Sequence, residues 1–236
     1  MKIMAYINQV LEILSDYGYK LRYHNRPYIE YYRAVMRRET KKDSERAVGM
    51  AGKGVGERQL ERLKIYGLKP EHTLFDFGCG RLRGGIPIIK YLAAGHYTGN
   101  DISQDILEVA KKRLYEAGLQ SKRPRLFYTD DLAFSEFTGE TFDYIHAQSV
   151  LSHMPPRDIE ELFKNVSSIM HKETQFIASY FPSKTGAIYS SVRERDFHYP
   201  FLWMKETGMN YGLRIEQVED VPGYSGKQPI IRIMLA

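Results

Sequence analysis

Short apolar runs alternate along the chain with segments whose apolar residues recur at helical spacing. Strands are predicted at 73–77, 96–101, 125–129, 142–147 and 175–180, and all of these but 96–101 combine aromatic with aliphatic residues. The segment that begins at Pro156 has one apolar face, made by Ile159, Leu162, Phe163, Val166, Ile169 and Met170. Strands that alternate with such helices predict parallel β-α-β units and an α/β fold.

The rest of the chain fits this alternation in part. Helices are expected over 57–66, over 86–93 and after Ser103, whose hydroxyl suits a helix N-cap. Runs at 213–218 and 230–235 predict two closing strands, whereas 182–211 is expected to be irregular. Residues 1–56 lack this alternation of strands and helices. They are predicted to be helical at first and loop-like toward residue 56. The pattern therefore predicts a helical cap at 1–56 and one α/β domain at 57–236.

Composition narrows the class of protein. The chain has 236 residues, of which 43% are hydrophobic and 27% charged, as in an ordinary globular domain. No apolar run approaches the ~20 residues of a membrane-spanning helix, and the first residues lack the pattern of a signal peptide. The single cysteine, Cys79, excludes an internal disulfide and a multi-cysteine metal site. We therefore expect a cytoplasmic protein with no metal site.

Basic and tyrosine residues concentrate near the start of the chain. Residues 1–50 carry ten Lys and Arg against six Asp and Glu, which accounts for most of the net charge of +5. Seven tyrosines occur by residue 32. Such a segment can stack nucleobases, or it can form a helical cap or a dimer surface. We favour the cap, and expect a monomer or homodimer.

A glycine-rich turn follows the first predicted strand. The sequence Asp76-Phe77-Gly78-Cys79-Gly80 continues to Gly84, which gives the spacing G-x-G-x-x-x-G. The dinucleotide fingerprint is G-x-G-x-x-G, so the spacing argues against a nicotinamide-dependent oxidoreductase. A carboxylate two residues before the first glycine would repel a pyrophosphate, but it suits a ligand that carries an ammonium group.

Acidic residues also follow the second and third strands. Asp101 ends the run at 96–101, and a carboxylate there can accept hydrogen bonds from both hydroxyls of a ribose. Asp131 follows the run at 125–129, and its neighbour Leu132 can pack on a base whose amino group Asp131 accepts. The alternatives are a helix-capping acid for Asp101 and an Asp-rich turn for Asp130 and Asp131. Together these positions indicate a site for an amino acid joined to adenosine.

The segments LFDFGCGRLRGG, TGNDIS, YTDDL and FDYIHAQSVLSHMPP closely resemble those of class I S-adenosylmethionine (SAM) dependent methyltransferases. The resemblance covers roughly residues 57–180. It implies a Rossmann-like three-layer α/β/α sandwich with a mostly parallel seven-stranded sheet, the last strand antiparallel, preceded here by an N-terminal helical extension. It also implies a site for SAM, and for its product S-adenosylhomocysteine (SAH), built from Asp76, Gly78, Cys79, Gly80, Asp101, Ile102, Asp131 and Leu132.

Methyl transfer from a sulfonium requires an acceptor in line with the methyl group and, for many acceptors, a base. His153, after the fourth strand, is our candidate for the base, because an ordinary imidazole can accept a proton near neutral pH. The alternative is a histidine that only lines the pocket or orders the loop. The resemblance also implies that Gln148 lies beside the methionine end of SAM.

The acceptor follows less directly from the sequence. The segment after the fourth strand lacks the Asn/Asp-Pro-Pro-Tyr pattern that resembles nucleic-acid amino-methyltransferases, and Cys79 lies in the glycine loop. Both points favour a small molecule, such as a sugar or secondary metabolite, methylated on oxygen or nitrogen. An RNA methyltransferase and a non-catalytic SAM-binding partner subunit remain the alternatives. Aromatic and basic residues of 180–211 are expected to contact the acceptor: Tyr180, Arg193, His198 and Tyr199.

Overall fold

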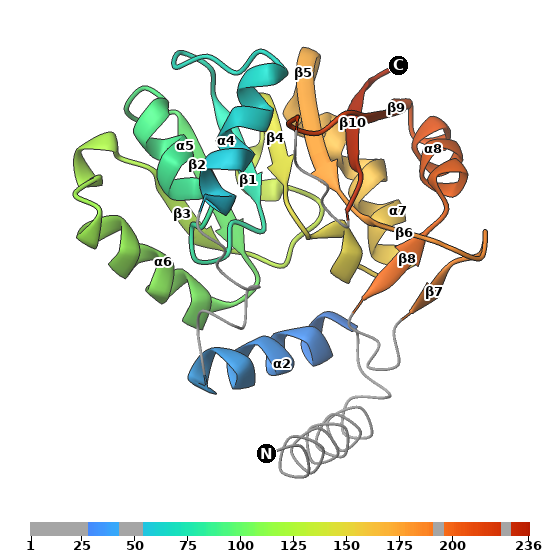
Figure 1. Cartoon of the computed structure of the whole chain (residues 1–236), viewed down its shortest axis with the longest axis horizontal. Coiled ribbons are helices and arrows are strands. Elements are labelled where there is room, and N and C mark those ends of the chain that lie inside the picture. Colours follow the sequence, from blue (N-terminus) through green and yellow to red (C-terminus); the bar gives the residue numbers. More distant parts are fainter. Residues whose placement is uncertain (1–27, 43–53, 191–195, 223–227) are drawn as a thin grey trace.

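A seven-stranded mixed sheet organises the described part of the protein. The computed structural model describes residues 28–42, 54–190, 196–222 and 228–236. The strands of the sheet are β1 (Leu74–Phe77), β2 (Tyr97–Asp101), β3 (Arg125–Tyr128), β4 (Phe142–Ala147), β5 (Met170–Ser179), β9 (Leu213–Val218) and β10 (Ile230–Leu235). Their order is β3-β2-β1-β4-β5-β10-β9 (Figure 1). Strands β1 to β5 are parallel, and β10 is antiparallel to both β5 and β9, so the predicted sheet is confirmed.

Helices cover both faces of this sheet. Helices α4 (Val55–Ile65), α5 (Gly85–Tyr91) and α6 (Gln104–Glu116) pack on one face, where Leu63, Ile88 and Leu107 share a buried cluster. Helices α7 (Pro156–Asn165) and α8 (Phe201–Asn210) pack on the other face through Phe163 and Met204. The result is the three-layer α/β/α arrangement that the family resemblance implies, built from the β-α-β units that the alternation predicts.

The segment expected to be irregular, 182–211, is instead largely regular. Its residues contribute to β6 (Phe181–Pro182), β7 (Tyr189–Ser190) and β8 (Phe197–Tyr199), which form a second sheet in the order β6-β8-β7, and to α8. Gly208 weakens the helical signal of α8 in the sequence, because glycine is a poor helix former. In the structure it allows a close approach, since a Cβ there would lie 2.5 Å from Ile215 Cδ1 of β9.

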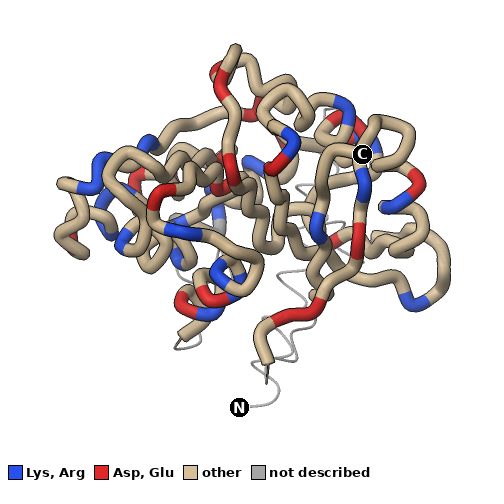
Figure 2. Tube along the Cα trace, turned by 90° about the horizontal axis from the view of Figure 1, so that it is seen from above, with Lys and Arg blue, Asp and Glu red and all other residues tan. Residues whose placement is uncertain are grey.

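Helix α2 (Tyr28–Lys42) crosses the carboxyl edge of the sheet between α6 and β8 (Figure 1). It is the described part of the expected cap at 1–56, apart from the start of α4. No helix among the described residues is long and apolar enough to cross a membrane. Over the same residues, basic and acidic positions are interspersed (Figure 2).

Candidate functional site

The glycine loop after β1 turns back toward the end of β2. Gly78 and Gly80 have φ of 73° and 56°, a left-handed conformation that favours glycine. The Gly78 N–H donates to Asn100 Oδ1 (3.2 Å), and the Gly80 N–H donates to Asp101 Oδ2 (3.0 Å). A Cβ at Gly78 would lie 2.6 Å from Val150 Cγ2. The loop therefore joins the carboxyl ends of β1, β2 and β4.

Cys79 lies between these two glycines with its thiol in the core. Its backbone N–H donates to the Asn100 carbonyl oxygen (2.8 Å). The thiol packs against Gly99, where a Cβ would come within 3.1 Å of Sγ. Burial raises the pKa of the Cys79 thiol, which keeps it neutral and unreactive. Only the backbone of Cys79 is thus placed to contact a ligand at the loop.

Asp101 fixes the end of β2 beside the loop. In addition to the Gly80 N–H, its carboxylate accepts the Ser103 N–H at Oδ1 (2.8 Å). Burial raises the pKa of Asp101 to about 6, although these N–H groups favour the charged form. A carboxylate has about four acceptor sites, so Asp101 can accept hydroxyl hydrogens in addition to these N–H groups. Ile102, the next residue, is partly buried.

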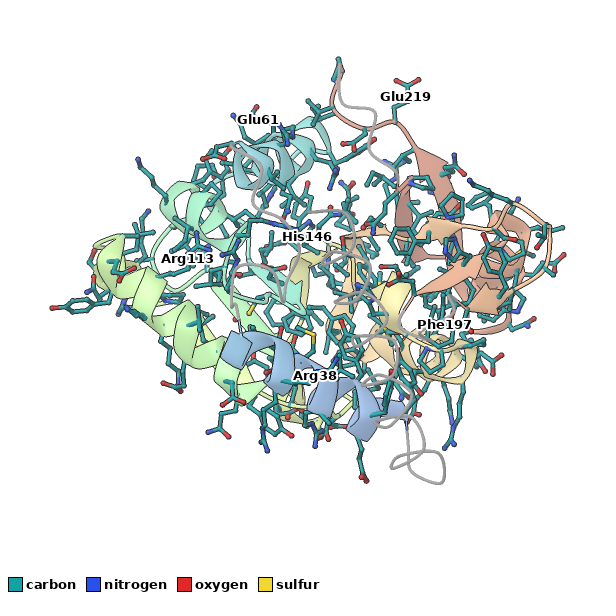
Figure 3. All side chains as sticks on the ribbon, turned by 60° about the horizontal axis from the view of Figure 1, so that its bottom comes forward. Arg38, Glu61, Arg113, His146, Phe197 and Glu219 are labelled. Atoms are coloured by element: carbon teal, nitrogen blue, oxygen red, sulfur yellow. The ribbon has the colours of Figure 1, made fainter. Side chains whose placement is uncertain are left out.

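Asp76 sits deeper than the sequence led us to expect. Its Oδ2 accepts the Tyr97 hydroxyl (2.5 Å), and its Oδ1 lies 3.1 Å from His146 Nδ1. Its side chain is only 6% exposed, and His146 is in the interior (Figure 3). Both carboxylate oxygens are therefore held by protein groups. The structure places Asp76 beside the loop, between Tyr97 and His146, and its contact with an ammonium group stays a prediction.

Asp131 organises the turn after β3. Its Oδ1 accepts the Ala133 N–H (2.8 Å), and its Oδ2 accepts the N–H and hydroxyl of Ser135. These hydrogen bonds hold the pKa of Asp131 below its usual range. Leu132 packs against the buried cluster on the α7 face. Asp130, the alternative acid, forms an ion pair with Arg33 of α2.

Gln148 belongs to a polar cluster at the carboxyl ends of β4 and β5. Its Oε1 accepts from Arg62 (2.6 Å), and its Nε2 donates to Ser179 (2.9 Å) and Gln228 (3.2 Å). Arg62 also forms a two-pronged ion pair with Asp220, at 2.8 Å for each nitrogen. The Gln148 amide is thus committed to holding the segment after β4 in place.

His153 ends the 3₁₀ turn Leu151–His153 after β4. Its Nδ1 lies 3.2 Å from Asp196 Oδ1, and its ring stacks on Tyr32 of α2 at 5.5 Å between centroids and 29° between planes. Phe181 approaches its edge at 6.5 Å. About 29% of the His153 side chain is exposed, so the imidazole remains accessible.

Two of the four expected acceptor residues lie in the core, which corrects the expectation for them. Tyr180 is 1% exposed and its hydroxyl contacts Gln217, while Tyr199 is fully buried and donates to the Met154 carbonyl oxygen. Tyr180 directly follows β5 and Tyr199 ends β8, but both side chains are buried in the core. His198 lies between Phe181 and Tyr189, with centroids 5.2 and 4.4 Å away. Arg193 lies outside the described residues.

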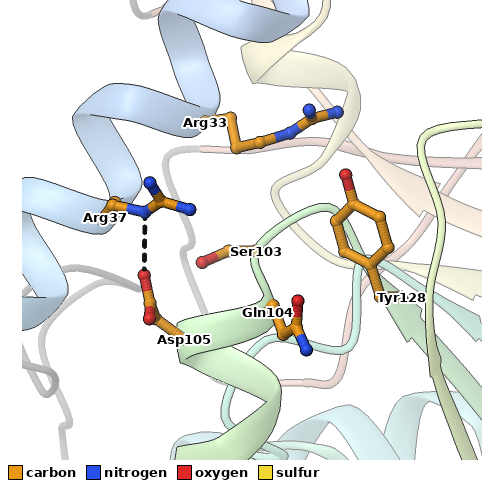
Figure 4. A pocket seen from close by; sticks show the side chains of 6 residues that line it. All are labelled: Arg33, Arg37, Ser103, Gln104, Asp105 and Tyr128. Carbon is orange, nitrogen blue, oxygen red and sulfur yellow. Dashed lines mark hydrogen bonds and ion pairs between the residues drawn. The ribbon is translucent and has the colours of Figure 1, made fainter.

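A pocket of about 180 Å³ lies between α2 and the start of α6 (Figure 4). Arg37 pairs with Asp105 at its edge (3.3 Å), and the Arg33 guanidinium lies 5.5 Å from the Tyr128 ring centroid. Sites for whole small molecules measure roughly 300–1,000 Å³. The pocket therefore has room for part of a ligand, directly beside the end of β2.

Several residues of this site have no motif of their own in the sequence. Tyr97 and His146 reach Asp76 from the strands on either side of β1, and Asp76 is opposite His146 in the β1–β4 register. Aligning the predicted strands β1 and β4 in this register would have predicted the contact between Asp76 and His146. Asp196 and Arg62 had no comparable signal, because their partners are distant in the chain.

The comparisons with known proteins agree with this architecture. Residues 75–176 match the methyltransferase domain family. A probable methyltransferase, ltbC, of Aspergillus luteorubrus is 28% identical over 95 residues, which are 39% of this chain. That match spans about a third of the length of the fungal protein (33%).

Solved structures show the same fold at low identity. Magnesium protoporphyrin IX methyltransferase from Synechocystis, crystallised with SAM, superposes with a TM-score of 0.68 at 18% identity, covering 89% of this chain and 98% of that one. The glycopeptide N-methyltransferase MtfA, also crystallised with SAM, gives 0.62 at 13% identity, covering 77% of this chain and 94% of that one.

The described sheet is that of an α/β protein with a glycine loop at the carboxyl end of its first strand. The match over residues 75–176 identifies a methyltransferase domain in the chain, and solved SAM-bound methyltransferases share its fold.

Proposed function

We propose that the protein transfers a methyl group from SAM to an oxygen or nitrogen of a small-molecule acceptor. The observation that carries the proposal is the pairing of Asp101 with the glycine loop. The partly buried carboxylate is fixed by the N–H groups of Gly80 and Ser103, and a carboxylate has about four acceptor sites, so it can still accept from ribose hydroxyls. Binding SAM would supply a methyl group on a sulfonium, which is a good leaving group.

The charges around the loop suit SAM better than a dinucleotide. Asp76 and Asp101 both lie at the loop, and each would disfavour a pyrophosphate. The same two carboxylates favour a ligand that carries a sulfonium and an ammonium group. The pocket beside Ser103 and Tyr128 has the position required for the adenosine end.

Helix α2 is proposed to act as a cap over this ligand. Arg33 pairs with Asp130 after β3, and Arg37 pairs with Asp105 after β2, while Tyr32 covers His153 after β4. The helix thus touches the segments that follow three of the strands that form the site. Because Arg33 and Arg37 already have acidic partners, these contacts support a cap more than a surface for RNA phosphates.

The proposal is tested by substitution of Asp101. Asp101→Ala is expected to weaken SAM binding at least about tenfold, because the ribose loses its acceptor and the loop loses a hydrogen bond. Glu108→Ala, on the exposed face of the adjacent helix α6, is the matched control. Unchanged SAM affinity in Asp101→Ala, measured by calorimetry, would refute the ribose assignment.

Activity itself is tested by the release of SAH. The full chain is incubated with SAM and a panel of small hydroxyl and amine acceptors, and SAH is quantified by mass spectrometry. Acceptor-dependent SAH release supports the proposal. Methylation of RNA but of no small molecule would move the function to the nucleic-acid alternative, and SAM binding without turnover on any acceptor would favour a binding subunit.

A further inference from the structure

The pocket between α2 and α6 is lined by side chains from two separate parts of the chain (Figure 4). Arg33 and Arg37 come from α2 and lie about one helical turn apart, so they face the same way. The other lining side chains come from the start of α6 and the end of β3, and they are Ser103, Gln104, Asp105 and Tyr128. A ligand in this pocket would therefore lie between α2 and the carboxyl edge of the sheet.

Two ion pairs join α2 to that edge. Arg37 Nε lies 3.3 Å from Asp105 Oδ2 in the first turn of α6, and Arg33 pairs with Asp130, just after β3. The Arg33 guanidinium also lies 5.5 Å from the Tyr128 ring centroid. Both arginines thus connect α2 across the pocket to the segments that follow β2 and β3.

The ion pairs are exposed to solvent, which limits their strength. The side chains of Arg37 and Asp105 are 65% and 44% exposed, and those of Arg33 and Asp130 are 28% and 45% exposed. An exposed pair typically changes an equilibrium by roughly 1.4- to 5-fold. Together the two pairs would favour a closed arrangement over an open one by roughly 2- to 30-fold, which holds α2 in place without locking it.

We propose that Arg33 and Arg37 form an ionic latch that sets the rate at which SAM enters the site and SAH leaves it. The inference rests on the proposed methyl transfer, because it takes the adenosine end of SAM to lie in this pocket. One SAM must enter and one SAH must leave in each turnover. When the pairs break, the arginine side of α2 can move away from α6, and when they form again the ligand is enclosed.

Two other roles fit these arginines less well. A site for a free anion would need positive charge that is not already balanced, yet each arginine has an aspartate as its partner. A rigid wall would be held by buried packing, whereas the contacts described for Arg33 and Arg37 are exposed ion pairs and one contact with a ring face. Contacts of this kind suit a segment that opens and closes.

The latch is tested first by the salt dependence of ligand exchange in the wild-type full chain. SAH is the probe, because it lacks the sulfonium charge whose attraction to the site would itself be screened. Dissociation is followed by chasing labelled SAH with excess unlabelled SAH, and association by rapid filtration. Salt screens exposed charges, so higher ionic strength should raise both rates about two- to fivefold and leave the dissociation constant within about twofold.

An exchange rate that does not change with salt would overturn the inference. Failure of SAM and SAH to bind at all would instead count against the proposed function.

Substitutions locate the effect in the two ion pairs. Arg33→Met and Arg37→Met keep much of the side-chain length but remove the charge, so each should raise both exchange rates of SAH roughly two- to fivefold. Asp105→Asn should match Arg37→Met, and the two combined should exceed neither, because they break the same pair. Lys111→Met, which removes the exposed ion pair with Glu108 on α6, is the matched control and should leave both rates unchanged.

Unchanged exchange rates in both arginine variants, or an equal rise in the Lys111 control, would overturn the inference. Additive effects of Arg37→Met and Asp105→Asn would do the same, because they would show that the two residues do not act as a pair. Faster dissociation without faster association would show that the arginines bind the ligand directly and do not control its passage.

Discussion

The raised pKa of Asp101 leads to a specific dependence of SAM binding on pH. The carboxylate must be ionised to accept both ribose hydroxyls, and burial raises the pKa of Asp101 to about 6. At pH 5 about one molecule in eleven is then ionised, against nearly all at pH 7.5. Because the apparent affinity falls with the fraction of competent protein, SAM binding should weaken about tenfold, which is about 1.4 kcal/mol.

The sign follows from linkage. A carboxyl group whose pKa is raised in the folded, unliganded protein binds more protons than in the unfolded chain. Its contribution to stability is therefore greatest below the ordinary aspartate pKa and is lost as the pH rises through about 6. Binding of SAM favours the ionised form, so over the same window the affinity rises while this contribution to the stability of the unliganded protein falls.

The assay is calorimetric titration with SAM at pH 5, 6, 7 and 7.5 in buffers of matched ionic strength. Asp101→Asn is the control, since it cannot ionise and should give weaker binding that changes little over this range. A wild-type affinity that is flat from pH 5 to 7.5 would refute the reasoning. The same slope in Asp101→Asn would assign the effect to another group.

Three further substitutions test the loop, the polar cluster and the core. Gly78→Ala places a Cβ 2.6 Å from Val150 Cγ2 at a φ of 73°, so the loop must shift. SAM binding measured by calorimetry should therefore weaken at least about tenfold. Normal affinity would show that the loop adjusts freely. Arg62→Met leaves the Asp220 carboxylate without its partner, so the free energy of unfolding measured in urea titrations should fall by about 3–5 kcal/mol. The double variant Arg62→Met with Asp220→Asn should recover part of this loss, because the unpaired charge is then removed. Phe163→Ala, at a fully buried position of α7, should cost about 3–5 kcal/mol in the same assay, and a cost below about 1 kcal/mol would contradict its core position.

The fold could be predicted from the sequence because its signals are local. Strands β1 and β4 are short and mostly apolar, and the helix from Pro156 keeps its apolar residues on one face. Helix α8 was missed for an equally local reason. Gly208 lowers the helix propensity of the segment, and its benefit appears only when β9 is packed against it.

The candidate site was predictable only where it follows strand ends. Gly78, Gly80 and Asp101 come together as expected, because carboxyl ends of adjacent parallel strands meet at one edge. The partners of Asp76 come from two different neighbouring strands. The ion pair of Arg62 with Asp220 joins positions 158 residues apart, and no local pattern encodes such a contact.

Pairs across the α2 interface were equally hidden. In the sequence, Tyr32 is one of several tyrosines in a basic segment, and Asp196 is one of several charged residues in a polar segment. Only the fold brings both to His153, where they orient the imidazole. The chemical environment of the candidate base is therefore a property of tertiary structure.

The most direct test of the account is a calorimetric titration of the full chain with SAM, SAH and NAD under identical conditions. The account predicts that SAM and SAH bind at one site per chain with micromolar affinity and that NAD gives no binding heat. Binding of NAD in place of SAM, or no binding of SAM or SAH, would contradict the assignment of the site formed by the glycine loop and Asp101.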